Sequence, residues 1–212
     1  MKRILFWALL AHSAAILAVR WNQPLVGEHG FRQTQTALSV FWLLRGGPWL
    51  AYWTPVLGPP WSIPFEFPLF QWIVALLARM GVGLDPSGRC VAWAFGVLAL
   101  FPLRRIATHF DIDPWIVGCL YLASPLYLYW STAFLIDTCA LFFAASFLAY
   151  GLEDKWIFCL LSGVLTALVK LPTLLPFAAV LLFLLWWPRS PWAFAGLPTR
   201  IELRRVRRLE HF

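Results

Sequence analysis

Long apolar runs dominate the chain and alternate with short polar connections. The runs cover residues 4–19, 69–80, 90–103, 115–130, 138–152, 156–169 and 173–187. A helix that crosses the ~30 Å hydrocarbon core of a bilayer needs about 20 mostly apolar residues, so the shorter runs have to be extended by flanking aromatic residues. Only helices or closed barrels satisfy backbone hydrogen bonds in lipid, and runs of this length exclude barrel strands. The pattern therefore predicts an all-α, polytopic transmembrane protein.

A long first connection, about residues 20–87, separates the first run from the third. Within it, residues 31–45 carry polar side chains at helical spacing opposite an apolar face, which predicts an amphipathic helix on the membrane surface. We interpret the run 69–80 as a half-helix in the outer interface that begins after Pro68. If this run does not cross the membrane, the basic residues after the later runs all fall on the cytoplasmic side, as the positive-inside rule favours. Six spans remain, with Lys170–Pro172 as either a tight outer turn or a kink. The residues placed on the cytoplasmic side are Lys2, Arg3, Arg104, Arg105, Lys155 and the basic tail 188–212.

Composition supports this class. Hydrophobic residues make up 61% of the chain and charged residues 13%, which is far less charge than a soluble domain carries. The net charge of +7 is concentrated in the arginine-rich tail, which is typical of a cytoplasmic stop signal or a contact with anionic lipid head groups. No separate folded basic domain is predicted, so nucleic-acid binding is excluded. The histidines and cysteines have no metal-ligand spacing, and neither a metal ion nor a cofactor is expected.

The predicted amphipathic helix carries the first candidate site. Arg32, Gln35, Thr36 and Ser39 form its polar stripe, and Glu28 lies one turn before Arg32. Glu28 and Arg32 alone would be an ordinary solvated ion pair at a helix start. Four polar groups that converge at lipid depth favour a functional site instead.

Three further charged residues interrupt apolar sequence. Asp137 opens the helix after residues 131–136, where a carboxylate marks function unless it serves only as a helix cap. Lys170 either reaches the outer interface with no further role or neutralises a lipid phosphate. Glu66 either caps the half-helix after Pro68 or lines a cavity, and we favour capping.

Five segments in order resemble a known family: FRQTQTA, LAYWTPVLGPPWSIPFEFPLFQWIVALL, Gly88–Arg89, SPLYLYWSTAFLID and LVKLPTLLPF. Together they resemble bacterial GT-C glycosyltransferases, of the family 39 group that holds dolichyl-phosphate-mannose-protein mannosyltransferases and aminoarabinose transferases. The resemblance covers about residues 1–187, which we define as a GT-C-like transmembrane domain. It implies transfer of a sugar from a polyprenyl-phosphate donor to a lipid, glycan or protein acceptor on the outer face of the inner (plasma) membrane.

The resemblance also implies residue roles. Asp137 matches the carboxylate of the second outer loop. Many members carry an Asp-Glu pair where this chain has Arg32 and Gln33, which leaves Glu28 as the nearest candidate base. Phosphate binding would then depend on Arg32, Arg89 or Lys170. The substrate-binding candidates are Arg32, Gln33, Gln35, Glu66, Arg89 and Lys170, and the catalytic candidates are Glu28 and Asp137.

Family members usually continue through several more spans, whereas here the pattern stops near Pro188. We therefore expect a product that corresponds to an N-terminal fragment. A transporter or channel component and a non-catalytic membrane fragment are the alternatives. A transporter would more often carry polar residues within several spans, or helices broken in two repeats.

Overall fold

The computed structural model describes residues 1–27, 29–56, 58, 59, 61, 62 and 66–186. Across these residues the fold is all-helical, with no strand. The helices are α1 (Lys2–Arg20), α2 (Gly30–Leu44), α3 (Leu69–Arg79), α4 (Leu84–Leu98), α5 (Leu100–His109), α6 (Pro114–Ala123), α7 (Pro125–Trp130), α8 (Asp137–Leu152) and α9 (Trp156–Trp186).

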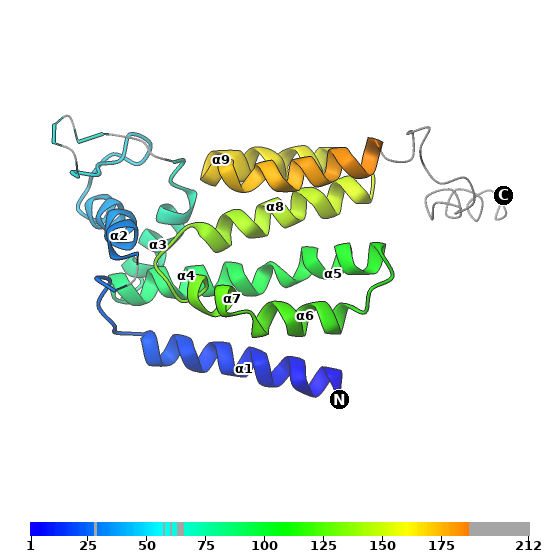
Figure 1. The fold of residues 1–212 in the computed structure, drawn as a ribbon. Coiled ribbons are helices and arrows are strands. Elements are labelled where there is room, and N and C mark those ends of the chain that lie inside the picture. The colour runs from blue at the N-terminus through cyan, green and yellow to red at the C-terminus, as the bar shows by residue number, and fades with distance from the viewer. Residues whose placement is uncertain (28, 57, 60, 63–65, 187–212) are drawn as a thin grey trace, which may run out of the picture.

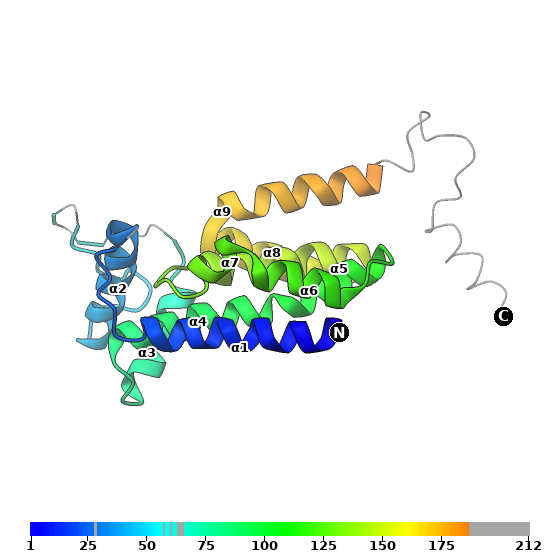
Figure 2. The same ribbon diagram turned by 60° about the horizontal axis from the view of Figure 1, so that its bottom comes forward.

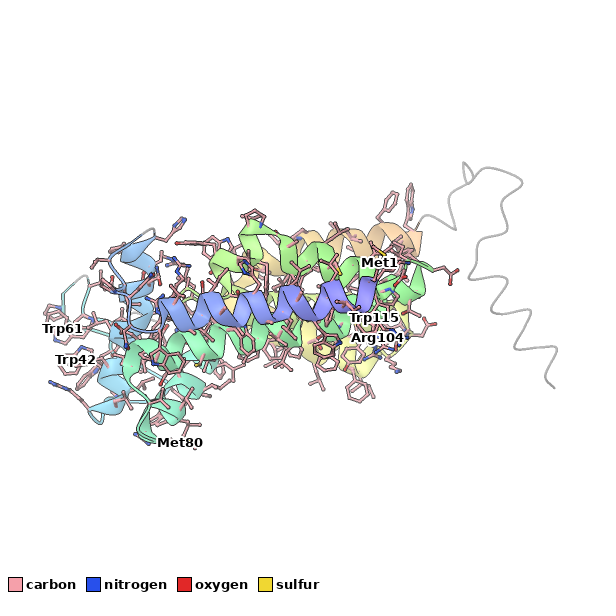
Figure 3. All side chains as sticks on the ribbon, turned by 90° about the horizontal axis from the view of Figure 1, so that it is seen from below. Met1, Trp42, Trp61, Met80, Arg104 and Trp115 are labelled. Atoms are coloured by element: carbon pink, nitrogen blue, oxygen red, sulfur yellow. The ribbon has the colours of Figure 1, made fainter. Side chains whose placement is uncertain are left out.

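The long helices lie along a common direction and form an elongated bundle (Figures 1 and 2). Helices α2 and α3 and the loops around them gather at one end, which we call the loop end. The chain begins at the opposite end, which we call the N-terminal end, and helix α9 ends there too (Figure 1). Figure 3 shows Trp42 and Trp61 at the loop end, and Met1, Arg104 and Trp115 at the N-terminal end.

Three segments within the described ranges are long and apolar enough to cross a membrane: Lys2–Arg20, Leu84–His109 and Trp156–Trp186. Helices α4 and α5 form the second of these, because Ala99 between them keeps right-handed helical geometry. Leu69–Arg79, Pro114–Ala123 and Asp137–Leu152 are apolar but shorter. Only 11% of the apolar window is buried in the first and in the third of the long segments, and such a surface is covered by lipid in membrane proteins.

Proline divides the apolar run 115–130, which the sequence pattern treats as one helix. The run forms α6 and α7, separated by Ser124 with an extended backbone (ψ 127°). Pro125 disfavours helical geometry at the residue before it and begins the next helix as its first residue. The break places the end of α7 beside the loop that leads to α8.

Helix α9 consists of two arms that meet at Lys170, whose backbone is not helical (φ −162°, ψ 89°). The first arm runs toward the loop end, and the second arm runs back beside it to the N-terminal end (Figures 1 and 2). Leu181 of the second arm packs with Cys159 of the first arm and with Leu148 of α8. Lys170–Pro172 is therefore a turn between two arms and not a kink in one long helix, whereas its predicted place on the outer side stays a prediction.

Ion pairs join helix ends at the N-terminal end of the bundle. Lys2 pairs with Asp113 at 2.8 Å, and Glu153 pairs with both Arg105 and Lys155. Asp113 also caps α6, where its side chain accepts the Trp115 N–H at 2.8 Å. These contacts fix the connections between α5, α6, α8 and α9 and leave the loop end as the place where other polar groups converge.

Candidate active site at the loop end

Helix α2 crosses the loop end with most of its predicted polar stripe turned toward the protein, while Arg32 of that stripe is exposed. Gln33, Gln35, Thr36 and Ser39 are buried, whereas Phe31 keeps 67% of its surface exposed. The Ser39 and Thr54 hydroxyls lie 2.7 Å apart, so the following loop shares the buried polar groups of this face. The predicted helix 31–45 is confirmed to within one residue at each end. Most of its polar face contributes to the protein interior.

Asp137 is the first residue of α8 and forms an ion pair with Lys170 at the turn of α9. Their side chains keep 26% and 28% of their surface exposed. A carboxylate in the first turn is stabilised by the amide groups of the helix N-terminus. The pair joins two positions 33 residues apart, and neither charge lies unpaired among the apolar side chains around it.

Proline chemistry explains how the first loop reaches this pair. Pro172 has no N–H, so the carbonyl of Leu168, four residues earlier, lacks its usual helical donor. The N–H of Phe67 donates to this carbonyl at 2.9 Å. The loop segment that carries Glu66 is thereby held against the turn of α9.

Glu66 is fixed through its backbone and through its side chain. Tyr52, which is 1% exposed, donates its hydroxyl to the Glu66 carbonyl at 2.8 Å and accepts the Glu66 N–H at 3.2 Å. The Gln71 amide donates to Glu66 Oε1 at 3.2 Å. Burial raises the pKa of Glu66 above its usual range, and Asp137 adds to this rise. Arg32, the Gln71 hydrogen bond and Lys170 act in the opposite direction on the same pKa.

Some of these charged residues line a cavity of about 290 Å³. Arg32 of α2, Glu66 of the loop and Lys170 of α9 line it, and Arg32 donates to Gln35 Oε1 at 3.3 Å. We call Arg32, Glu66, Asp137 and Lys170 the four-charge cluster. It contains two cations and two carboxylates from four separate elements, which is a set able to bind a phosphate and accept a proton.

A second cavity of about 190 Å³ lies between α6, α7 and α8. Tyr121, Tyr127 and Trp130 line it, and Asp137 contributes to its wall. Asp137 thus contacts an aromatic cavity while its partner Lys170 contacts a charged one. The apolar pattern of residues 115–130 gives no sign of this cavity, although Pro125, at the break beside it, is visible in the sequence.

Two predicted substrate-binding residues, Arg89 and Gln33, form hydrogen bonds with backbone groups and do not line the cavity with Arg32 and Lys170. Arg89 is 2% exposed and donates to the Thr132 carbonyl at 3.0 Å and to the Gln23 carbonyl at 2.7 Å. Gln33 Oε1 accepts the Phe134 N–H at 3.0 Å. Both side chains hold the segment that leads to Asp137.

Arg20 adds a third contact to this segment, with its Nη1 donating to Thr132 Oγ1 at 2.7 Å. Arg20, Tyr52 and Gln71 are supporting residues that the sequence pattern did not predict. Of the three, only Gln71 could have been found from the sequence, because it is a lone amide within an apolar stretch. In the structure it is 1% exposed. Glu28 lies outside the described residues, so its predicted role as a base stays a prediction.

No metal site emerges from the described part of the chain, where no three His, Cys, Asp or Glu side chains come together. Comparisons with protein-family models, curated proteins and solved structures found no match to this chain.

Proposed function

We propose that this protein is an inner-membrane glycosyltransferase that moves a sugar from a polyprenyl-phosphate donor to an acceptor hydroxyl on the outer face. The observation that carries the proposal is the four-charge cluster, in which Asp137 pairs with Lys170, and Lys170 lines one cavity together with Arg32 and Glu66. The resemblance to GT-C family 39 supports the same reading. Sugar transfer needs a base for the acceptor, cations for the departing phosphate and a cavity that excludes water.

In the proposed reaction, Asp137 accepts the proton of the acceptor hydroxyl as its oxygen attacks the anomeric carbon of the sugar. A new carbon–oxygen bond forms, and the bond between the anomeric carbon and the phosphate oxygen breaks. The phosphate leaves with the bonding electrons, and Arg32 and Lys170 stabilise its charge. Glu28 stays a candidate for the base as well.

The proposed topology has six spans: α1, α4–α5, α6–α7, α8 and each arm of α9. The loop end then lies outside, with α2 and α3 in the outer interface, and the N-terminal end lies in the cytoplasm. Labelling of single cysteines placed at Thr34 and Ser190 tests this topology, and labelling of both from the same side would refute it.

One observation favours a transporter as the second candidate. Two helices break beside Asp137, at Ser124 between α6 and α7 and at Lys170 within α9. Transporters commonly bind substrates at such breaks. The two functions differ in what happens to the donor bond.

Proteoliposomes that contain the purified chain distinguish the two functions. The chain is supplied with polyprenyl-phosphate-linked hexoses and pentoses, and released polyprenyl phosphate and glycosylated product are measured. The transferase proposal predicts both products in equal amounts for at least one donor. Flux of a solute across the vesicle membrane without cleavage of any donor would overturn it.

A further inference from the structure

The four-charge cluster is electrically balanced before any ligand enters. Lys170 is paired with Asp137, which leaves Arg32 and Glu66 as the second oppositely charged couple at the cavity. An anion that enters between Arg32 and Lys170 therefore meets the negative charge of Glu66 as well as the two cations. The number of charges on the anion decides how strongly Glu66 opposes it.

Glu66 cannot move away from such an anion without breaking several contacts. Tyr52 bonds its backbone on both sides, Gln71 bonds its carboxylate, and the next residue, Phe67, bonds the turn of α9. A rigidly held carboxylate keeps its repulsion at full strength. Displacement of Glu66 would also disconnect the first loop from α9.

Every element packed around Glu66 contributes to its electrostatic surroundings. Arg32 comes from α2, Gln71 from α3, Asp137 from α8 and Lys170 from α9. Burial favours the neutral form of Glu66, while the two cations favour the charged form. A bound anion shifts this balance toward proton uptake by Glu66, since it cancels part of the cationic field.

We infer that Glu66 is a specificity residue that makes the cavity prefer a singly charged phosphodiester over a doubly charged phosphate monoester. The inference rests on the proposed function and names the charge state of its donor. A polyprenyl-phosphate-linked sugar is a phosphodiester with one negative charge, whereas the polyprenyl phosphate left after transfer carries about −1.5 to −2 near neutral pH. Glu66 therefore admits the donor and repels the product, which promotes product release.

The test compares two short probes that differ in charge. Geranyl methyl phosphate is a phosphodiester and geranyl phosphate is a monoester, and their binding to the full chain in nanodiscs is measured by calorimetry at pH 8. The wild type should bind the diester on the order of tenfold more tightly, because one additional charge near Glu66 is disfavoured. Glu66→Gln keeps the shape and should lose this preference through tighter binding of the monoester.

Two further variants serve as controls. Glu66→Asp keeps the charge and should retain a preference for the diester. Asp154→Asn removes the same charge from an exposed position at the opposite end, and asparagine tolerates the positive φ of 59° found there. This variant should behave as the wild type.

A second readout is the pH dependence of diester binding, because the charge of this probe does not change between pH 5 and 8. Wild-type affinity should rise as the pH falls and Glu66 takes up a proton, and Glu66→Gln should show no such rise. Equal binding of both probes by the wild type, or an unchanged preference in Glu66→Gln, would overturn the inference and leave the proposed transferase standing. Failure of the wild type to bind either probe would overturn the inference together with the proposed donor site.

Discussion

Arg89 offers a sharp test of whether a buried cation holds the structure or binds substrate. Its guanidinium, 2% exposed, donates to backbone carbonyls of Gln23 and Thr132 at 2.7 and 3.0 Å. These carbonyls belong to the loop after α1 and to the segment before Asp137. Arg89 therefore joins two pieces of chain that both lie at the loop end.

Replacement of Arg89 by lysine keeps the charge but removes the planar fork. A single ammonium group does not reach both carbonyls, so at least one charge-assisted hydrogen bond is lost, worth about 1.5 to 3 kcal/mol. Thr132 is fully buried, so its carbonyl has no water as a replacement partner. We expect Arg89→Lys to lower the free energy of unfolding by about 2 kcal/mol.

The measurement is unfolding in mixed micelles with increasing SDS, followed by tryptophan fluorescence. Arg104→Lys is the matched control, because Arg104 is exposed, and it should change stability by less than about 0.5 kcal/mol. If Arg89 served mainly to bind a phosphate, lysine would supply a similar point charge. Unchanged stability of Arg89→Lys would refute the structural role.

Two further predictions concern packing and charge. Gly88→Ala should destabilise the protein by about 1 to 3 kcal/mol, because the new methyl group would lie 2.2 Å from ring carbons of the fully buried Phe134; Gly27→Ala meets no atom within 4 Å, and equal stability of the two variants would contradict this packing. The hydrogen bond from Arg105 is the main cause that lowers the pKa of Glu153 from 4.5 to about 2. Its stabilising effect is therefore present above pH 4.5 and lost as the pH falls toward 2, so the stability difference between wild type and Glu153→Gln should shrink over this window. A difference that stays constant from pH 6 to pH 2 would contradict the pairing.

Hydrophobic pattern alone predicted most of the helices, and its errors have local causes. The run that starts at residue 90 belongs to a helix that already begins at Leu84. Asp85, Ser87 and Arg89 lower the hydropathy of that first part, although an acidic residue early in a helix is favourable. Pro125 predicts a break at the residue before it. The apolar pattern alone does not show this break, because the run stays apolar on both sides of it.

The candidate site was predicted only in part, for a different reason. The sequence marked Glu66, Asp137 and Lys170 as charges that interrupt apolar sequence, and Arg32 as part of the polar stripe of residues 31–45. Their meeting depends on tertiary contacts, such as the bond from Phe67 to Leu168, that no periodicity encodes.

The resemblance to the glycosyltransferase family also selected Arg89, whose charge serves backbone carbonyls. To tell a structural cation such as Arg89 from a cation that binds substrate, one has to know which groups the side chain contacts in the folded protein. A single sequence does not contain that knowledge, because the Thr132 and Gln23 carbonyls are 43 and 66 positions away from Arg89.

The most direct test of the transferase account is the rate of sugar transfer by Asp137→Asn, measured beside Asp113→Asn with a donor that the wild type cleaves. Asp113 lies at the N-terminal end, where asparagine also caps a helix, so this variant should keep the wild-type rate. Asp137→Asn keeps its shape and loses a general base, and its rate should fall at least about 100-fold while the protein stays folded. Wild-type transfer by Asp137→Asn would contradict the placement of the active site in the four-charge cluster.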